Sequence, residues 1–247
     1  MRRHLPVLLC LVLVASSPNC FSQINSLQQL LLNASQAFAR NGPASSIVLS
    51  GQLERVVGPD HENGTVTMTV RADGSSSVQM QLSSGERSEI QDAFAKGHGC
   101  SWSGTDGIAH SAAAHNCIMP LAWPLPEVTL FSSQLPPSGS FSIGSTSEGS
   151  NIVLHWAKQM PTANAEQARL FAHIGSCDLT FDASSFLPTS FSYAVYPDDS
   201  AGVDIPVLIR YSDYQTINGV AIPFHIERFF NGVLSLDITL STAVVNN

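Results

Sequence analysis

The chain has 247 residues, which is enough to bury a sizeable hydrophobic core in one domain or two. Eleven Lys and Arg residues stand against 19 Asp and Glu residues, and charged residues make up only 12% of the sequence. This acidic balance argues against nucleic acid and against an anionic membrane surface as partners, because either would require a basic patch. The sparse charge and abundant small polar residues are typical of an exported β-protein.

The first 22 residues have the layout of a secretory signal peptide. Arg2 and Arg3 form a basic start, and residues 5–15 form a short apolar run, too short to span a bilayer comfortably. Small and helix-breaking residues follow, and we expect cleavage after Ser22, which leaves residues 23–247 as a single domain. Losing Arg2 and Arg3 leaves 9 basic residues against 19 acidic ones, a net charge of −10.

Cys20 leaves a lipid anchor open as an alternative. A lipid-modified cysteine normally follows an apolar residue at −3 and a small one at −1, but Ser17 and Asn19 stand there, so ordinary export is favoured. An uncleaved membrane anchor is the remaining alternative, and no later stretch is long and apolar enough for a transmembrane helix. We therefore expect a periplasmic or extracellular protein.

After the leader, the pattern predicts one helix and then strands. Ser26 can cap a helix whose apolar residues recur at helical spacing, and Asn41-Gly42 offers a stop. Those apolar residues are Leu27, Leu30, Leu31, Ala34 and Phe38. Strand-like runs follow at residues 47–57, 65–71, 78–82 and 87–94, with turns predicted at 60–64 and 73–76.

The middle of the chain predicts one hairpin and one short helix. Residues 100–103 face residues 108–110 across an Asp106-Gly107 turn. Residues 119–135 are apolar but interrupted by prolines, and a short helix is expected at 127–133.

The second half is again mostly strand. Runs at residues 140–146, 151–159, 178–182 and 189–196 predict strands, and residues 165–174 predict a short helix. Residues 205–242 predict a three-stranded antiparallel meander, because two Asn-Gly pairs separate runs in which apolar and polar residues alternate. Together, these signals indicate a mainly β fold with one large antiparallel sheet that closes toward a barrel, covered by the N-terminal helix.

Two segments carry a resemblance to a known group. Residues 211–224, Tyr-Ser-Asp-Tyr-Gln-Thr-Ile-Asn-Gly-Val-Ala-Ile-Pro-Phe, and residues 179–188, Leu-Thr-Phe-Asp-Ala-Ser-Ser-Phe-Leu-Pro, resemble hairpins of bacterial proteins related to outer-membrane lipoprotein carriers and receptors. The resemblance implies an incomplete, open barrel of about ten strands, with helices lying across its concave side. It also implies a capacity to hold an acyl chain or another apolar molecule between the sheet and the helices.

Five residues of types that can bind metals or form disulfides lie within twenty positions of one another: His98, Cys100, His110, His115 and Cys117. Zinc takes thiolate and imidazole ligands, but the spacing matches no known zinc motif, and an exported protein meets an oxidising compartment. The hairpin also returns the chain towards Cys100. We therefore expect a disulfide between Cys100 and Cys117, with α-carbons roughly 4.5 to 7 Å apart. Free thiols and a metal site stay open as alternatives.

Catalytic signatures are weak throughout. Cys177 would be left as a buried free thiol, and a nucleophilic role with His173 as its base lacks a recognised motif. Asp198 and Asp199 form an acidic pair at an expected hairpin tip. The Gly-x-Ser-x-Gly motif of serine hydrolases does not occur between a predicted strand and a predicted helix. The sequence therefore predicts a protein that is not an enzyme and needs no cofactor.

Aromatic residues are spread through the chain. Phe229 and Phe230 are consecutive, so in a strand one should line the core and the other should be partly exposed or face the covering helix. Phe224, Trp102, Trp123 and Trp156 are expected to pack in the core or line an apolar groove. Two functions follow as hypotheses. One is a non-enzymatic carrier-like protein that holds a lipid; the other is an interaction module of the cell envelope with a filled interior. The oligomeric state stays open.

Overall fold

The computed structural model describes residues 19–97, 99–134, 139–145, 151–160 and 164–246. Most of the expected signal peptide, residues 1–18, and the candidate ligand His98 lie outside the described residues.

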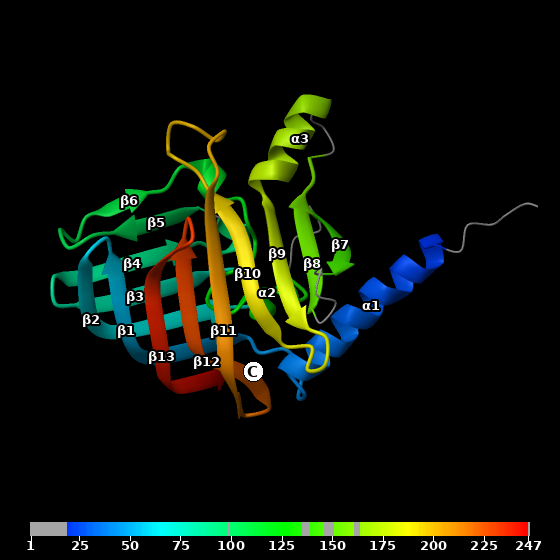
Figure 1. The fold of residues 1–247 in the computed structure, drawn as a ribbon, viewed down its shortest axis with the longest axis horizontal. Coiled ribbons are helices and arrows are strands. Elements are labelled where there is room, and N and C mark those ends of the chain that lie inside the picture. The colour runs from blue at the N-terminus through cyan, green and yellow to red at the C-terminus, as the bar shows by residue number, and fades with distance from the viewer. Residues whose placement is uncertain (1–18, 98, 135–138, 146–150, 161–163, 247) are drawn as a thin grey trace, which may run out of the picture.

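One antiparallel sheet of thirteen strands dominates the described part of the chain (Figure 1). The strands are β1 Ser46–Val57, β2 Asp60–Arg71, β3 Ser76–Leu82, β4 Gly85–Gln91, β5 Cys100–Ser103, β6 Ala109–Ser111, β7 Gly139–Ser145, β8 Asn151–Lys158, β9 Ser176–Asp182, β10 Pro188–Val195, β11 Ile205–Ile217, β12 Val220–Phe230 and β13 Val233–Asn246. Their spatial order is β6-β5-β4-β3-β2-β1-β13-β12-β11-β10-β9-β8-β7. The sheet is therefore an open barrel with two edges, β6 and β7.

The strand order divides the sheet into two meanders. Strands β1 to β6 run from the centre to one edge, and the chain then crosses to the opposite edge at β7. Strands β7 to β13 return to the centre, where β13 pairs with β1. In Figure 1 the strands of the first meander run across those of the second, so the sheet curls around a concave side.

The strands form where the sequence alternates, and their turns follow local chemistry. Strand β3 shows regular alternation between buried and more exposed residues, as a half-buried strand should. The two Asn-Gly turns of the C-terminal meander adopt positive φ, with Asn218 at 51° and Asn231 at 49°. This is the backbone that a two-residue hairpin requires, so the predicted meander is confirmed.

A bulge in β1 adds to the curvature. The register of β1 against β13 shifts between Ser50 and Gly51. A Cβ atom at Gly51 would collide with the carbonyl oxygen of Thr239, so only glycine fits this approach. Bulges bend a strand and increase its twist, which helps the sheet to close toward a barrel.

Three α-helices accompany the sheet: α1 Asn19–Phe38, α2 Pro126–Leu130 and α3 Ala165–Ile174, with short 3-10 helices η1 Phe94–Lys96 and η2 Ala114–Cys117. Helix α1 buries Leu30, Ala34 and Phe38 in the core, as its spacing predicted. All five residues of α2 are buried, and Figure 1 places this helix on the concave side of the sheet. Asn164 and Gln167 form a capping box at the start of α3, which matches its predicted bounds.

Two expectations need correction. Residues 60–64 were expected to be a turn, but they open β2, because Gly58 at φ 60° makes a tighter turn and Val57 pairs directly with Asp60. One cross-strand ion pair, between Arg55 and Glu62, lies at this polar start. The resemblance implied about ten strands, whereas the described residues form thirteen, which agrees with the strand-like runs of the sequence.

Candidate functional site

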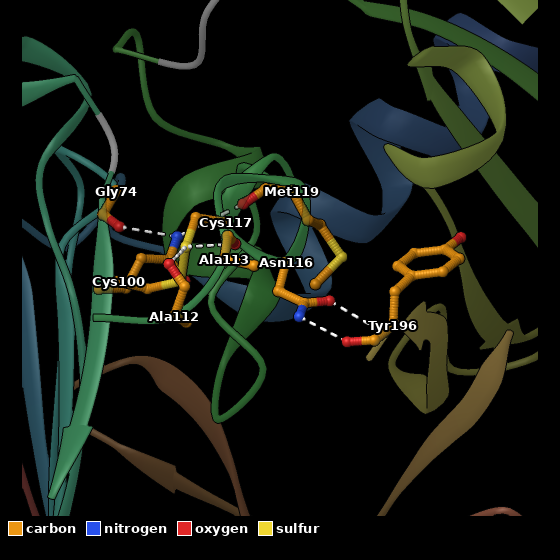
Figure 2. The surroundings of a disulfide bond; sticks show 9 residues. Gly74, Cys100, Ala112, Ala113, Asn116, Cys117, Met119 and Tyr196 are labelled. Carbon is orange, nitrogen blue, oxygen red and sulfur yellow. Dashed lines mark hydrogen bonds between the residues drawn. A yellow bond between two sulfur atoms is a disulfide. The ribbon is translucent and has the colours of Figure 1, made fainter. Parts of the chain in front are cut away.

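The segment that crosses between the two meanders covers part of the concave side. Residues 112–123, called the strap below, leave β6 and lead to α2. The Cys100–Cys117 disulfide links the start of the strap to β5, and the two α-carbons lie 5.6 Å apart. The Ala112 amide also donates a hydrogen bond to the Cys100 carbonyl (3.0 Å). Figure 2 shows the disulfide between the strap and the edge of the sheet. The predicted pairing is therefore present.

The strap also reaches the second meander. Asn116 points towards Tyr196 just beyond β10 (Figure 2). Its side-chain amide donates to the Tyr196 carbonyl and its side-chain oxygen accepts from the Tyr196 amide, both at 2.8 Å. A ring nitrogen of His115 lies 3.1 Å from the Pro197 carbonyl. The strap thus bridges the two sides of the curled sheet.

A cavity of about 280 Å³ lies beneath the strap. Its lining includes Val78, Leu121, Trp123, Val195 and Phe230, and both disulfide cysteines contribute to it. Small-molecule sites typically have volumes of roughly 300–1,000 Å³, so this cavity suits one small or elongated apolar group rather than a bulky one.

An ion pair crosses this apolar interior. Arg228 on β12 donates two hydrogen bonds to the carboxylate of Glu89 on β4, both at 2.8 Å, and Trp123 Nε1 donates a third at 3.2 Å. The Arg228 side chain is only 8% exposed, and its guanidinium stacks over the rings of Trp123 (4.8 Å) and Phe230 (5.1 Å). Strands β4 and β12 belong to different meanders, so the pair joins them across the concave side.

The charges of this pair are stabilised by each other. Burial by itself raises the pKa of Glu89, but the guanidinium of Arg228 and the hydrogen bonds from Arg228 and Trp123 lower that pKa below its ordinary value. Burial likewise lowers the pKa of Arg228, and the Glu89 carboxylate raises it overall. The buried Nε of Arg228 has no hydrogen-bond partner among the described residues. This donor therefore stays unsatisfied between the two rings.

A buried acid lies on α2. Glu127 is 1% exposed, and neither of its carboxylate oxygens has a hydrogen-bond partner within the described residues. Burial raises the pKa of Glu127 to about 7. Sequence reasoning gave Glu127 no role. The signal was present, because the residue stands in an apolar, proline-rich segment.

The histidines of the cysteine-rich segment have other partners. Both cysteines are bonded to each other and offer no thiolate to a metal. His110 stacks on Trp102 with ring centroids 4.5 Å apart, and His115 packs edge-on against Tyr196 at 5.9 Å. The structure does not bring these two imidazoles together as ligands, and His98 lies outside the described residues.

The predicted free thiol lies in the core. Cys177 is 3% exposed, and burial raises the pKa of its thiol, so no reactive thiolate forms at neutral pH. His173 hydrogen-bonds to Asp204 (2.9 Å) instead. This geometry gives the nucleophile hypothesis no support.

Most of the aromatic residues pack in or against the core, as Phe224 does, or line the cavity. Phe230 lines the cavity while Phe229 stacks under Arg210 (4.8 Å), so consecutive residues do face opposite sides. Trp156 is 3% exposed in the core, and Trp123 lines the cavity. Trp102 lies at the cavity rim and remains 48% exposed.

The fold is similar to those of known structures. A putative outer membrane lipoprotein-sorting protein domain from Vibrio parahaemolyticus aligns with a TM-score of 0.53 at 9% identity, covering 92% of this chain and 93% of that one. A LolA superfamily protein from Nitrosomonas europaea aligns with a TM-score of 0.52 at 10% identity, covering 89% and 93%. The chain has a LolA-like fold.

A third structure widens the range of this LolA-like fold. A DUF1329 family protein from Desulfovibrio piger aligns with a TM-score of 0.56 at 6% identity, covering 90% of this chain and 93% of that one. No protein-family profile matches the sequence, and no curated protein matches it. Among the residues that the structure describes, no helix is both long and apolar enough to cross a membrane. At these identities the likeness concerns the fold alone.

Proposed function

We propose that this protein is an exported, non-enzymatic binding protein of the bacterial cell envelope that carries a lipid or another apolar molecule in the cavity beneath the strap. In this proposal residues 1–22 are a signal peptide and residues 23–247 are the single working domain. Export supplies the oxidising compartment that the Cys100–Cys117 disulfide requires.

The observation that carries the proposal is the apolar cavity with a single charged pair in its wall. Apolar side chains offer favourable contact to an acyl chain, and burying that chain removes its surface from water. The lining also includes polar side chains such as Ser76 and Ser101. An amphipathic ligand with an acyl chain and an oxygen acceptor therefore matches the lining better than a plain hydrocarbon.

The geometry also supports binding without catalysis. Arg228 and Glu89 neutralise each other, and the Cys177 thiol is buried in the core. One protein of similar fold is described as a putative outer membrane lipoprotein-sorting protein domain. Sorting of this kind calls for a binding site and not for a reaction centre.

A direct experiment is to express the chain with its own leader, purify the exported protein and analyse it by native mass spectrometry. We expect a fraction of the protein to carry a bound lipid, and we expect protein freed of lipid to take up a fluorescent fatty acid at one site. Protein with no bound lipid and no uptake would refute the proposal.

The second candidate is an interaction module of the cell envelope. The β5–β6 hairpin at the sheet edge favours it, because Trp102 is 48% exposed and Ile108 is 58% exposed there. If the hairpin is a contact surface, Ile108→Asp will abolish recovery of a partner in cross-linking experiments. It will leave fatty-acid uptake unchanged.

A further inference from the structure

The outer face of the sheet carries a cluster that the cavity does not involve. His225 and Glu227 lie on β12 and Asp237 lies on β13, and their potential ligand atoms all lie within 4.8 Å of one another. Among the described residues, this is the one group in which three His, Cys, Asp or Glu side chains meet so closely.

The sheet register builds this cluster. Glu227 pairs with Asp237 in adjacent antiparallel strands, and His225 lies two residues before Glu227 on the same face. All three side chains are half-buried. They are therefore positioned by regular strands, not by a loop.

The arrangement places like charges side by side. Carboxylates directly opposite each other on a sheet are unfavourable without a compensating cation. Arg210 is the in-register neighbour of Glu227 on β11, but its guanidinium stacks over Phe229 at 4.8 Å. The Glu227 carboxylate has no hydrogen bond or ion pair of its own in the described part of the chain.

The neighbouring charges leave an excess of negative charge on this face. Glu54 pairs in register with Asp237 on its other side and lies 2.6 Å from His61. The face thus holds Glu54, Glu227 and Asp237 against the single arginine Arg210. A dication would be attracted here and would relieve the repulsion.

The imidazole is oriented for a metal. His225 Nε2 faces Asp237 at 2.8 Å, and His225 Nδ1 lies 3.1 Å from the Ser212 hydroxyl. Asp237 accepts a hydrogen bond from Nε2, so a metal ion would displace the Nε2 proton. Nδ1–H would then donate to the Ser212 hydroxyl, and the Nε2 lone pair would face the metal. This is the outer-shell hydrogen bond that metal-binding histidines commonly make.

We propose that His225, Glu227 and Asp237 form a binding site for one divalent transition-metal ion such as Zn²⁺. One imidazole nitrogen and two carboxylate oxygens are ligands that zinc accepts, and three protein ligands leave a fourth position for water. The site lies on the face opposite the cavity, so it is independent of the proposed lipid binding.

The chain offers a matched control. His155 on β8 and Asp178 on β9 form a cross-strand pair at 2.6 Å with similar exposure, and they belong to no cluster of three among the described residues. A variant of this pair removes an imidazole beside a carboxylate without touching the proposed site.

The test uses chain exported with its own leader, purified without a histidine tag and stripped of metal, then titrated with Zn²⁺ by calorimetry. We expect one equivalent to bind to the unmodified protein and to His155→Ala. His225→Ala and Asp237→Asn should each weaken binding by more than about tenfold, since even outer-shell changes cost 10- to 100-fold. Ser212→Ala should cost about tenfold.

Circular dichroism would verify that each variant is folded, and Glu227→Gln provides an additional ligand variant on an exposed face. Unmodified protein that binds no zinc would overturn the proposal. So would folded His225→Ala or Asp237→Asn that binds zinc as tightly as the unmodified protein does.

Discussion

Arg228 is the residue on which the interior of this molecule depends most clearly. It stands at an interior position of β12, and the only acid hydrogen-bonded to it among the described residues is Glu89 on β4. Removing one member of a buried pair leaves the other charge without compensation. The two residues should therefore be strongly coupled in their effect on stability.

A double-mutant cycle measures this coupling. We expect Arg228→Met alone to destabilise the fold by about 2 to 3 kcal/mol, because the Glu89 side chain, 33% exposed, loses two charged hydrogen bonds but is partly reached by water. Glu89→Gln in the Arg228→Met background should cost less than in the unmodified protein. Additive effects in urea unfolding would contradict this account.

Glu127 is expected to set a pH dependence of stability. The pKa of Glu127 is about 7 in the folded state and 4.5 ordinarily. Between pH 4.5 and pH 7, Glu127 is therefore protonated in the folded protein and ionised in the unfolded chain. The free energy of unfolding is therefore highest, as far as Glu127 is concerned, below pH 4.5, and it falls as the pH rises to about 7. The loss is on the order of 3 kcal/mol.

Glu127→Gln should remove this dependence and make the protein more stable than the unmodified chain at pH 8. The measurement is the free energy of unfolding in urea at pH 4.5 and pH 8 for both proteins. Glu86→Gln on β4, which changes an exposed acid, is the control and should leave the slope intact. A slope unchanged by Glu127→Gln would show that this carboxyl is not the group responsible.

At the scale of elements, the strap is the part that the disulfide stabilises. Reduction, or the double variant Cys100→Ser with Cys117→Ser, should lower the free energy of unfolding by about 3 kcal/mol. This is the stabilisation expected when a disulfide closes a loop with a sequence separation of 17. Thermal unfolding with and without reductant measures this. Denatured, unreduced exported protein should show one reactive thiol, Cys177; three thiols would contradict the pairing.

Local chemistry explains which elements could be predicted from sequence. The Asn218 and Asn231 turns, the cap at Asn164 and the alternation in β3 are all decided by neighbouring residues. The start of β2 was missed because a Gly-Pro pair made the turn two residues earlier. The Glu89–Arg228 pair was missed because its strands lie far apart in the sheet order and meet only when the sheet curls.

For the whole molecule, the structure is an open barrel closed on one side by its own crossing segment. Strands β1 to β6 and β7 to β13 are two meanders that pair along β1 and β13. Across the concave side, the strap, with its disulfide to β5, and the Arg228–Glu89 pair connect them again. Residues of the strap, the disulfide and the ion pair line the cavity. Filling the cavity without disturbing the connections therefore isolates its role.

Ala112 provides that opportunity, because its small side chain lines the cavity from the strap. The most direct measurement compares fatty-acid binding by lipid-free unmodified protein, Ala112→Phe and the exposed control Ala114→Phe, with thermal unfolding to verify the fold. We predict one site in the unmodified protein and in Ala114→Phe, and at least about tenfold weaker binding in Ala112→Phe, since a phenyl ring would occupy much of the space. Equal binding by all three proteins would contradict the assignment of the cavity as the ligand site.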